Sequence, residues 1–324
     1  TQGRSLIWSA HVDVVPATDW EQAFEPRVEG NRVIGRGAVD AKGQVVTALL
    51  ALGALKELGV RLQGRLEVQF VIEEEFGGNG ALALIRAGRE ADGVVVLEPT
   101  NHQVHPANRG ALWFRFTVEG KPTHMGRKQE GVSAIEQAVE LIHLLQTYEQ
   151  RLVEESRGVP QFERYEHPVQ VNVGTIRGGE WPSMVPAQVA LEGGVGFLPN
   201  KAMAQVKEEL RALVENHGGE WLRSHYRLEF PKLHNDSYAI PSDHPLPVGL
   251  QAACSEVGVP AEVFGWNISC DARLYNRVGG MPTVVYGPGE TAQAHSRGES
   301  IEIEDMLRAA AVLALFAIRW CGAA

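Results

Sequence analysis

Cysteine is scarce in this sequence. Only three occur among its 324 residues, at Cys254, Cys270 and Cys321, and no two of them form a CxxC pair. An odd, widely scattered set does not make a disulfide framework and is typical of proteins from a reducing compartment. The spacing also argues against a zinc site built from thiolates. We therefore expect a cytoplasmic protein.

Positive charge is also in short supply, and long apolar runs are missing. The chain has 30 Lys and Arg against 40 Asp and Glu, which gives a formal net charge of −10. A nucleic acid or an anionic membrane needs a basic surface on its partner, so neither is expected to bind here. No apolar run reaches the length of a membrane span, and no signal peptide is visible.

What the sequence does have is an alternation of strands and helices at both ends of the chain. Strands are expected at 5–10, 65–72, 93–97 and 282–286, and helices at 42–58, 80–87, 247–257 and 302–317. Such alternation predicts βαβ units and a mostly parallel sheet with helices on both faces. The predicted fold class is therefore α/β.

A different pattern interrupts this one between residues 109 and 219. Polar and apolar residues alternate at 111–119, 170–176 and 188–197, as in half-exposed antiparallel strands, and helices are expected at 132–155 and 202–216. We expect an inserted α+β domain of two helices on an antiparallel sheet. Residues 1–108 and 220–324 would then form one domain from both sides of the insert.

Three adjacent carboxylates follow the strand at 65–72. Glu73, Glu74 and Glu75 come directly after an apolar run and directly before a glycine-rich turn. Adjacent carboxylates repel each other, and each loses hydration close to a protein core. A positive group is therefore expected among them, either a metal ion or a cluster of basic side chains. For an isolated triplet, a solvated strand end would be the simpler explanation.

Other side chains of the metal-ligand type stand at strand ends or in tight turns. They are His11 and Asp13, Asp40 within the glycine-rich turn 35–43, Glu98, and His295. The carboxyl ends of the strands of an open α/β sheet gather at one edge, where ligands bind. Histidines and carboxylates without thiolates suit zinc, manganese or cobalt, and there are enough of them here for two ions. Each motif alone has an ordinary structural explanation, but their combination favours a metal centre.

In these residues the chain resembles the dinuclear-metal aminoacylase and carboxypeptidase family, which includes acetylornithine deacetylase and succinyl-diaminopimelate desuccinylase. The matching segments are 11–16, 35–43, 73–75, 98–100, 287–289, 294–295 and, in the insert, 120–126 and 131–135. The resemblance covers nearly the whole chain. It implies a catalytic domain interrupted by a lid or dimerisation domain, hydrolysis of a linear amide, and two divalent ions. Zinc would be the metal, with cobalt or manganese as alternatives.

The resemblance also implies a role for each ligand-type residue. Asp40 would bridge the two ions. One ion would be held by His11 and Glu98, and the other by Glu75 and His295.

Three further residues take roles from the same resemblance. Asp13 would orient the histidine ligand. Glu74 would be the general base that takes a proton from a water bridging the ions, with support of the ligands as its rival role. His124, in the insert, would help to stabilise the oxyanion.

The sequence departs from the family pattern in two places. The first motif begins at residue 11, earlier than in the family, so an N-terminal part of the catalytic domain is expected to be missing. In the insert, Ser183 and Gly196 stand where the family often has an Asn and commonly an Arg that grips the substrate's carboxylate. Arg273, beside Asp271, could supply that cation, because Arg suits bidentate carboxylate binding. A structural pair of Arg273 with Asp271 or Asp305 is the alternative.

These features predict an acetylornithine-deacetylase-like N-deacylase for a small N-acyl amine or N-acyl amino acid, active as a homodimer through the insert. A metallo-dipeptidase or carboxypeptidase with the same metal site is an alternative. The glycine at 196 leaves room for an N-formyl aminopyrimidine deformylase, whose substrate lacks an α-carboxylate. A non-catalytic, metal-stabilised binding module is the alternative from a different class.

Overall fold

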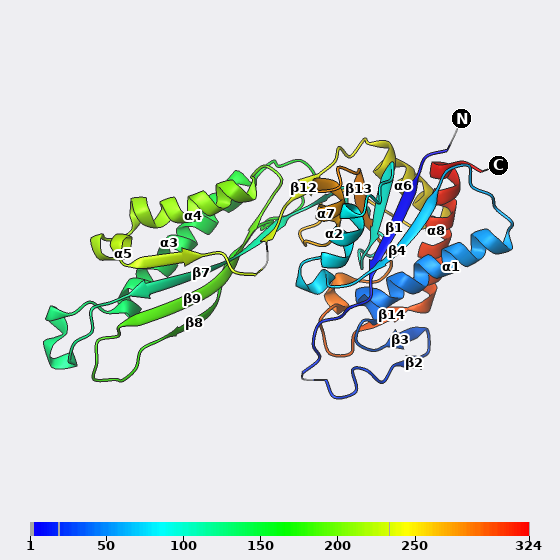
Figure 1. The fold of residues 1–324 in the computed structure, drawn as a ribbon. Helices are drawn as coiled ribbons and strands as arrows, with labels where there is room; N and C mark the ends of the chain where they lie inside the picture. Colours follow the sequence, from blue (N-terminus) through cyan, green and yellow to red (C-terminus); the bar gives the residue numbers. More distant parts are fainter. Residues whose placement is uncertain (1–2, 19, 233, 324) are drawn as a thin grey trace. The chain divides into compact units, whose positions relative to one another are not determined.

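The fold is that of a computed structural model, which describes residues 3–18, 20–232 and 234–323. The chain divides into two compact units, which can be followed by their colours in Figure 1. Unit 1 contains the chain up to Asn108, Tyr238–Trp266 and the chain from Cys270 onward. Unit 2 contains Arg109–Ser237 and Asn267–Ser269.

A four-stranded parallel sheet forms the centre of unit 1. Its strand order is β13 (Thr283–Tyr286), β5 (Gly93–Leu97), β1 (Leu6–His11) and β4 (Leu66–Val71), and every pairing is parallel. The accompanying helices are α1 (Gly43–Glu57), α2 (Asn79–Arg86), α6 (Pro245–Val257), α7 (Ala272–Arg277) and α8 (Ile303–Cys321). The predicted α/β class with a parallel sheet is confirmed.

Helices cover both faces of this sheet, as the side chains of β1 show. Leu6 and Trp8 belong to the apolar core that also contains residues of α1, α6 and α8. On the opposite face, the hydroxyl of Ser9 lies 2.8 Å from the hydroxyl of Tyr275 in α7. Because successive residues of a strand point to opposite faces, β1 is buried on both sides, which explains its nearly continuous apolar sequence.

Unit 1 contains several short elements that the sequence pattern does not predict. A small antiparallel sheet joins β2 (Arg27–Glu29), β3 (Arg32–Ile34) and β14 (Ser300–Glu302), and β6 (Ala107–Asn108) pairs with β12 (Tyr238–Ala239). Three helical turns are η1 (Ala38–Lys42), η2 (Glu74–Phe76) and η4 (Thr291–Gln293). Segments of two to five residues are too short to show a hydrophobic period, so the sequence pattern does not reveal them.

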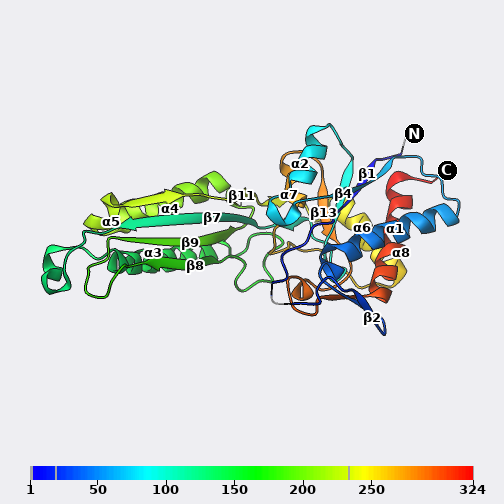
Figure 2. The ribbon, with the colours of Figure 1, turned by 60° about the horizontal axis from the view of Figure 1, so that its bottom comes forward.

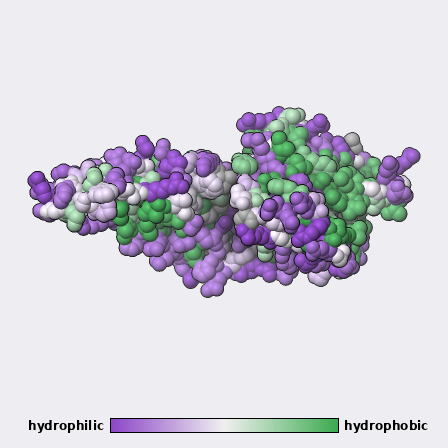
Figure 3. Space-filling model, turned by 90° about the horizontal axis from the view of Figure 1, so that it is seen from below, coloured by the Kyte–Doolittle hydropathy of each residue, from purple (hydrophilic) through white to green (hydrophobic). Residues whose placement is uncertain are grey.

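One helical stretch of unit 1 is unusually apolar. Ala38–Glu57 is long and apolar enough to cross a membrane by length and composition alone, which corrects the expectation that no run reaches that length. Half of its apolar window is buried within the structure, and α1 packs against α8, as a core helix does. Its other face exposes Val46, Leu49 and Leu50. Figure 3 shows apolar side chains gathered over unit 1.

Unit 2 is an antiparallel sheet with two long helices packed against it. The strand order is β10 (Tyr226–Glu229), β7 (Gly110–Glu119), β9 (Gln188–Phe197) and β8 (Val171–Gly178), and β11 (His234–Asn235) also pairs with β7. The strands can be followed along their length in Figure 2. The helices are α3 (Ala134–Glu155) and α4 (Met203–His217), with the shorter η3 (Met125–Glu130) and α5 (Glu220–Ser224).

The two faces of the unit 2 sheet differ in burial. Along β7, Leu112, Phe114 and Phe116 are buried, whereas Trp113 between them is 43% exposed. This alternation is what the sequence pattern at 111–119 predicts for a sheet with one covered face.

The boundary of unit 2 lies later in the chain than the sequence indicates. The expected return to the first domain was at residue 220, but residues up to Ser237 belong to unit 2. The reason is that β10 and β11 pair with β7 and so extend its sheet. These strands have only four and two residues, too few to show a period.

Candidate metal centre

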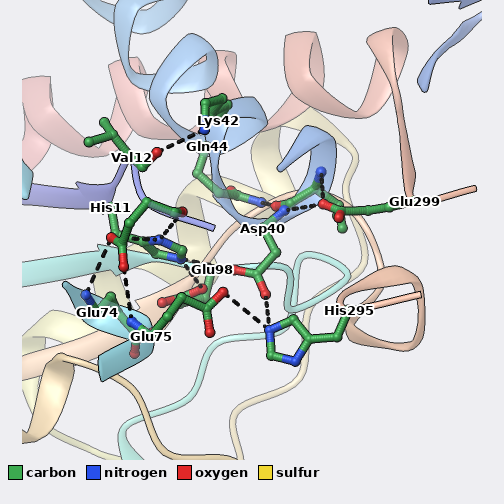
Figure 4. A network of polar contacts seen from close by, with 12 residues as sticks. His11, Val12, Asp40, Lys42, Gln44, Glu74, Glu75, Glu98, His295 and Glu299 are labelled. Carbon is green, nitrogen blue, oxygen red and sulfur yellow. Dashed lines mark hydrogen bonds and ion pairs between the residues drawn. The ribbon is translucent and has the colours of Figure 1, made fainter. Parts of the chain in front are cut away.

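The candidate centre lies at the carboxyl ends of the parallel strands of unit 1 (Figure 4). β1 ends at His11, β5 ends just before Glu98, and β4 ends shortly before Glu75. Because neighbouring parallel strands end at one edge of the sheet, side chains far apart in the sequence meet there. Asp40 from η1 and His295 from the loop after η4 complete the set.

His11 is held in a fixed orientation at the end of β1. Its Nδ1 donates to the main-chain oxygen of Asp13 at 3.0 Å, and its Nε2 lies 2.9 Å from Oδ1 of Asp40 and 3.9 Å from Oε2 of Glu98. Burial lowers the pKa of His11, but hydrogen bonds to Asp13 and Asp40 outweigh it and raise the pKa to about 12. Nε2 is thus the nitrogen that faces the carboxylates, where a proton and a metal ion would compete.

The carboxylate of Asp13 connects two strand ends. Its two oxygens accept hydrogen bonds from the backbone N–H groups of Glu74 and Glu75 at 3.3 and 3.2 Å. Its Oδ1 lies 3.5 Å from Nδ1 of His11, farther than the main-chain oxygen of the same residue. The sequence expectation named only the carboxylate as the group that orients His11. The structure adds the carbonyl as the nearer partner.

Asp40 stands between the two histidines. Its Oδ1 faces Nε2 of His11, and its Oδ2 lies 3.2 Å from Nε2 of His295. Burial alone raises the pKa of the Asp40 carboxyl, but hydrogen bonds to His11 and His295 outweigh it and hold the pKa well below its usual range. The two oxygens of one carboxylate are therefore divided between two sets of ligand atoms.

These contacts define two groups of ligand atoms that share Asp40. The first is His11, Asp40 and Glu98, and the second is Asp40, Glu75 and His295. Within each group the ligand atoms lie within 4.8 Å of one another. In the second, Nε2 of His295 lies 3.2 Å from Oε1 of Glu75. A carboxylate shared by two adjacent groups is the arrangement that closely spaced metal ions require.

The three carboxylates of the acidic triplet point to different partners. Glu73 accepts a hydrogen bond from Asn79 Nδ2 at 2.7 Å, away from the centre. Glu75 belongs to the second ligand group. Burial, followed by the nearby charge of Asp271, raises the pKa of Glu74 to about 8. The backbone turns at Glu73, where φ is 63°, so the three carboxylates do not point the same way.

The charge balance of the centre fits divalent cations. The carboxylates of Asp40, Glu75 and Glu98 lie close to two histidines, and no lysine or arginine of the described residues forms an ion pair with them or with Glu74. Burial raises the pKa of Glu98 well above its usual value, which shows how poorly this charge is compensated. Oxygen and imidazole ligands without thiolates suit zinc, cobalt or manganese.

Comparison with known proteins agrees with this geometry. The profile of Peptidase family M20/M25/M40 matches residues 7–319. The chain belongs to this family. Hydrolysis of amide bonds is the chemistry of M20 enzymes, so the expected enzyme class is confirmed.

Individual M20 relatives act on different amides. An acetylornithine deacetylase from Myxococcus xanthus is 30% identical, over 98% of this chain and 80% of the relative. An N-formyl-4-amino-5-aminomethyl-2-methylpyrimidine deformylase from Bacillus subtilis (strain 168) is 28% identical, over 98% and 79%. A solved dinuclear metal-binding peptidase of the M20 family from Bacillus subtilis matches with a TM-score of 0.72 at 16% identity, over 99% of this chain and 82% of that one. The last similarity supports the fold.

Sequence reasoning missed one residue of this M20 centre, Glu299. Its Oε1 accepts hydrogen bonds of 3.0 Å from the backbone N–H groups of Val39 and Asp40, and its Oε2 accepts one of 2.8 Å from Nη1 of Arg36. Both Glu299 and Arg36 are buried. The carboxylate therefore fixes the backbone that carries Asp40. No local spacing links these residues, which lie on opposite sides of unit 2 in the sequence.

Arg273 and Asp271 lie in unit 1 and are both buried. Arg273 donates to the main-chain oxygens of Cys270 and Gly77, each at 2.8 Å, and lies 3.8 Å from Asp271. These contacts favour the structural alternative for Arg273. Asp271 lies so close to Gly78 that a Cβ there would meet its Oδ1 at 2.1 Å, and neither of its carboxyl oxygens has a hydrogen-bond partner among the described residues.

His124 and Gly196 belong to unit 2. His124 is exposed just before η3, and its Nδ1 accepts a hydrogen bond from the Gly126 N–H at 3.1 Å. Gly196 is buried on β9. Their proposed roles toward a substrate stay predictions.

Proposed function

We propose that this protein is a metal-dependent N-deacylase, which cleaves a linear amide and releases a short acid and an amine. The supporting observation is that the two oxygens of Asp40 face two separate groups of ligands. In this proposal Asp40 would be a ligand shared by two ions. His11 and Glu98 hold one of them, and Glu75 and His295 hold the other. Zinc suits these ligands best, with cobalt or manganese as alternatives.

Glu74 is the proposed general base. When bound, the cations would lower the pKa of a water and polarise the carbonyl of the substrate. Glu74 takes the proton from the attacking water and passes it to the leaving amine. Its pKa of about 8 belongs to the metal-free protein, and bound cations would lower that pKa toward the range in which a base accepts and then returns a proton near neutral pH.

Two other residues support the reaction in this proposal. Asp13 fixes the ring of His11 and, through its carboxylate, the backbone of the base. In the proposed dimer, His124 would donate a hydrogen bond to the oxyanion in the site of the partner subunit. We also propose a cytoplasmic homodimer formed through unit 2, as the sequence predicts.

The substrate is proposed to be a small N-acyl amine or N-acyl amino acid. A second candidate is an N-formyl aminopyrimidine. It is favoured by Gly196, which replaces the arginine expected there for a substrate carboxylate, and by the similarity to the Bacillus subtilis deformylase.

Turnover of defined amides tests this proposal. Protein loaded with zinc, cobalt or manganese is assayed with N-acetyl, N-formyl and N-succinyl amines and with dipeptides. Loss of the base in Glu74→Ala should lower turnover about 10²- to 10⁴-fold while the bound metal stays unchanged. Glu73→Ala is the matched control, because Glu73 faces Asn79, and it should keep its activity. Hydrolysis of none of these compounds would favour the binding module instead.

A further inference from the structure

Unit 2 contains a cavity of about 640 Å³. One of its lining residues is an arginine that forms no ion pair with a described residue. Its lining includes Arg109, Trp113, Gln170, Gly194 and Gly196. None of these residues belongs to the candidate metal centre, and all lie within unit 2.

The guanidinium of Arg109 is only partly satisfied. Nη1 donates to the side-chain oxygen of Gln170, Nε is buried without a partner, and Nη2 makes no hydrogen bond to a described residue. No carboxylate of the described chain forms an ion pair with it. Burial lowers the pKa of Arg109, and no neighbouring negative charge opposes that effect. Because a partly buried cation without a counter-ion is costly, an anion from outside would relieve it.

Gly196 provides the space that this guanidinium occupies. A Cβ at residue 196 would lie 2.8 Å from Nη1 and 3.3 Å from Cζ of Arg109. Gly196 is paired with Ala111, two residues along the chain from Arg109. Any larger side chain at 196 would therefore compete with the guanidinium for the same volume.

The rest of the cavity suits a monoanion that is joined to a flat or apolar group. The indole of Trp113 is exposed, and Nζ of Lys232 lies 5.4 Å from its ring centre, which adds a second cation nearby. Glu149 also lines the cavity, but its carboxylate accepts the backbone N–H of Val171 at 3.0 Å. This negative charge disfavours a phosphate dianion more than a carboxylate.

We propose that this cavity binds a carboxylate, which the Arg109 guanidinium holds while Trp113 packs against the attached group. The planar guanidinium matches the geometry of a carboxylate. The site requires neither the metal centre nor amide hydrolysis, so its test is a binding measurement.

Benzoate and its neutral analogue benzamide are suitable probes. The metal-loaded protein, labelled with ¹⁵N-arginine, is titrated with each, and the Nε–Hε resonance of Arg109 is identified by its loss in Arg109→Met. Benzoate should shift this resonance and benzamide should not. Arg109→Met removes a hydrogen bond between benzoate and a charged group. The dissociation constant of benzoate at this cavity, measured by calorimetry, should therefore rise about tenfold or more.

Two glycine variants control for effects on folding. Gly196→Ala keeps the arginine but displaces its guanidinium, so benzoate binding should weaken about threefold or more. Gly194→Ala adds a methyl group beside the same cavity, at ordinary contact distances of 3.4 Å from Trp113 and 3.6 Å from the main-chain oxygen of Leu112, and this variant should bind benzoate as the parent protein does. The proposal is wrong if benzamide shifts the Arg109 resonance as benzoate does. It is also wrong if benzoate affinity is the same in the parent protein, Arg109→Met and Gly196→Ala.

Discussion

Both units bring carboxylates together, but they neutralise them in different ways. In unit 2, Nζ of the buried Lys201 lies 2.6 Å from Oε2 of Glu155 and also contacts Glu209. Tyr148 donates its hydroxyl to the same Glu209 at 2.9 Å. In unit 1, the ion pairs of the Asp40 carboxylate with described residues are those with the rings of His11 and His295.

The difference shows which cluster needs an ion from outside. Hydrogen bonds from Lys201 and Tyr148 outweigh burial and lower the pKa of Glu209, so this carboxylate is stable as an anion. Burial raises the pKa of Glu74 to about 8 and that of Glu98 well above its usual value, so both carboxylates are less stable as anions when no cation is present. An acidic cluster is thus evidence for a metal only when the chain's own cations are missing from it.

The largest effect is expected at Asp40, because it belongs to both ligand groups. Asp40→Asn should lose both ions, whereas Glu98→Gln should lose one. Turnover should fall about 10³-fold or more in Asp40→Asn, since metal catalysis contributes several kcal/mol. Metal content after dialysis and turnover are measured together. Glu209→Gln in unit 2 is the control and should bind as much metal as the parent, and a loss there would break the comparison.

That His11 and Glu98 lie close together in unit 1 could be predicted from the sequence, but the contact of Glu299 with this site could not. His11 is the last residue of β1 and Glu98 directly follows β5, and parallel strands end at one edge, so the positions of these residues in the sequence predict that they meet. Glu299 acts on the backbone of Asp40 across a tertiary contact, and nothing in its local sequence marks that contact.

The charged cluster of unit 2, formed by Glu155, Lys201 and Glu209, could not be predicted from the sequence either. Lys201 precedes α4 and Glu155 ends α3, and only the packing of these helices brings the charges together. For the same reason the sequence did not show that the side chain of Arg109, just before β7, occupies the space left by Gly196 on β9.

The two units should respond to pH with opposite signs. In metal-free protein the folded-state pKa of Glu74 is about 8, above its ordinary value of 4.5, and that of His295 is raised to about 10 by Asp40 and Glu75. The folded state therefore binds more protons than the unfolded state above pH 4.5. Its free energy of unfolding should fall as pH rises toward 8, by on the order of a few kcal/mol.

Unit 2 should instead lose stability in acid. Folding lowers the pKa of Glu209, so this carboxylate stabilises the folded state fully above its ordinary pKa, and the stabilisation is lost as pH falls through its folded-state pKa. Hydrogen exchange of chelated protein at several pH values reports each unit separately. Adding zinc should remove the alkaline loss in unit 1 and leave unit 2 unchanged. An alkaline loss that persists with zinc would contradict the assignment of these carboxylates to a metal centre.

A smaller effect is expected when unit 2 loses its internal cation. Lys201→Met leaves Glu155 and Glu209 without their shared ammonium, and the free energy of unfolding should fall by about 2 kcal/mol. Denaturant unfolding measures it, with and without zinc, and the loss should be the same in both. Lys128→Met is the matched control, because its pair with Glu136 is exposed and should contribute about 0.5 kcal/mol or less.

The smallest effect is expected at Glu299, which touches Asp40 only through the backbone. Glu299→Gln keeps the size of the side chain but weakens its hold on Arg36 and on the N–H groups of Val39 and Asp40. Zinc affinity should fall about tenfold, as for other groups that orient metal ligands, with the unfolding of unit 2 unchanged. Glu302→Gln, whose partner Arg32 is exposed, is the control. Equal zinc affinity in both variants would mean that Asp40 is positioned without Glu299, and calorimetric titration of the chelated proteins distinguishes these outcomes.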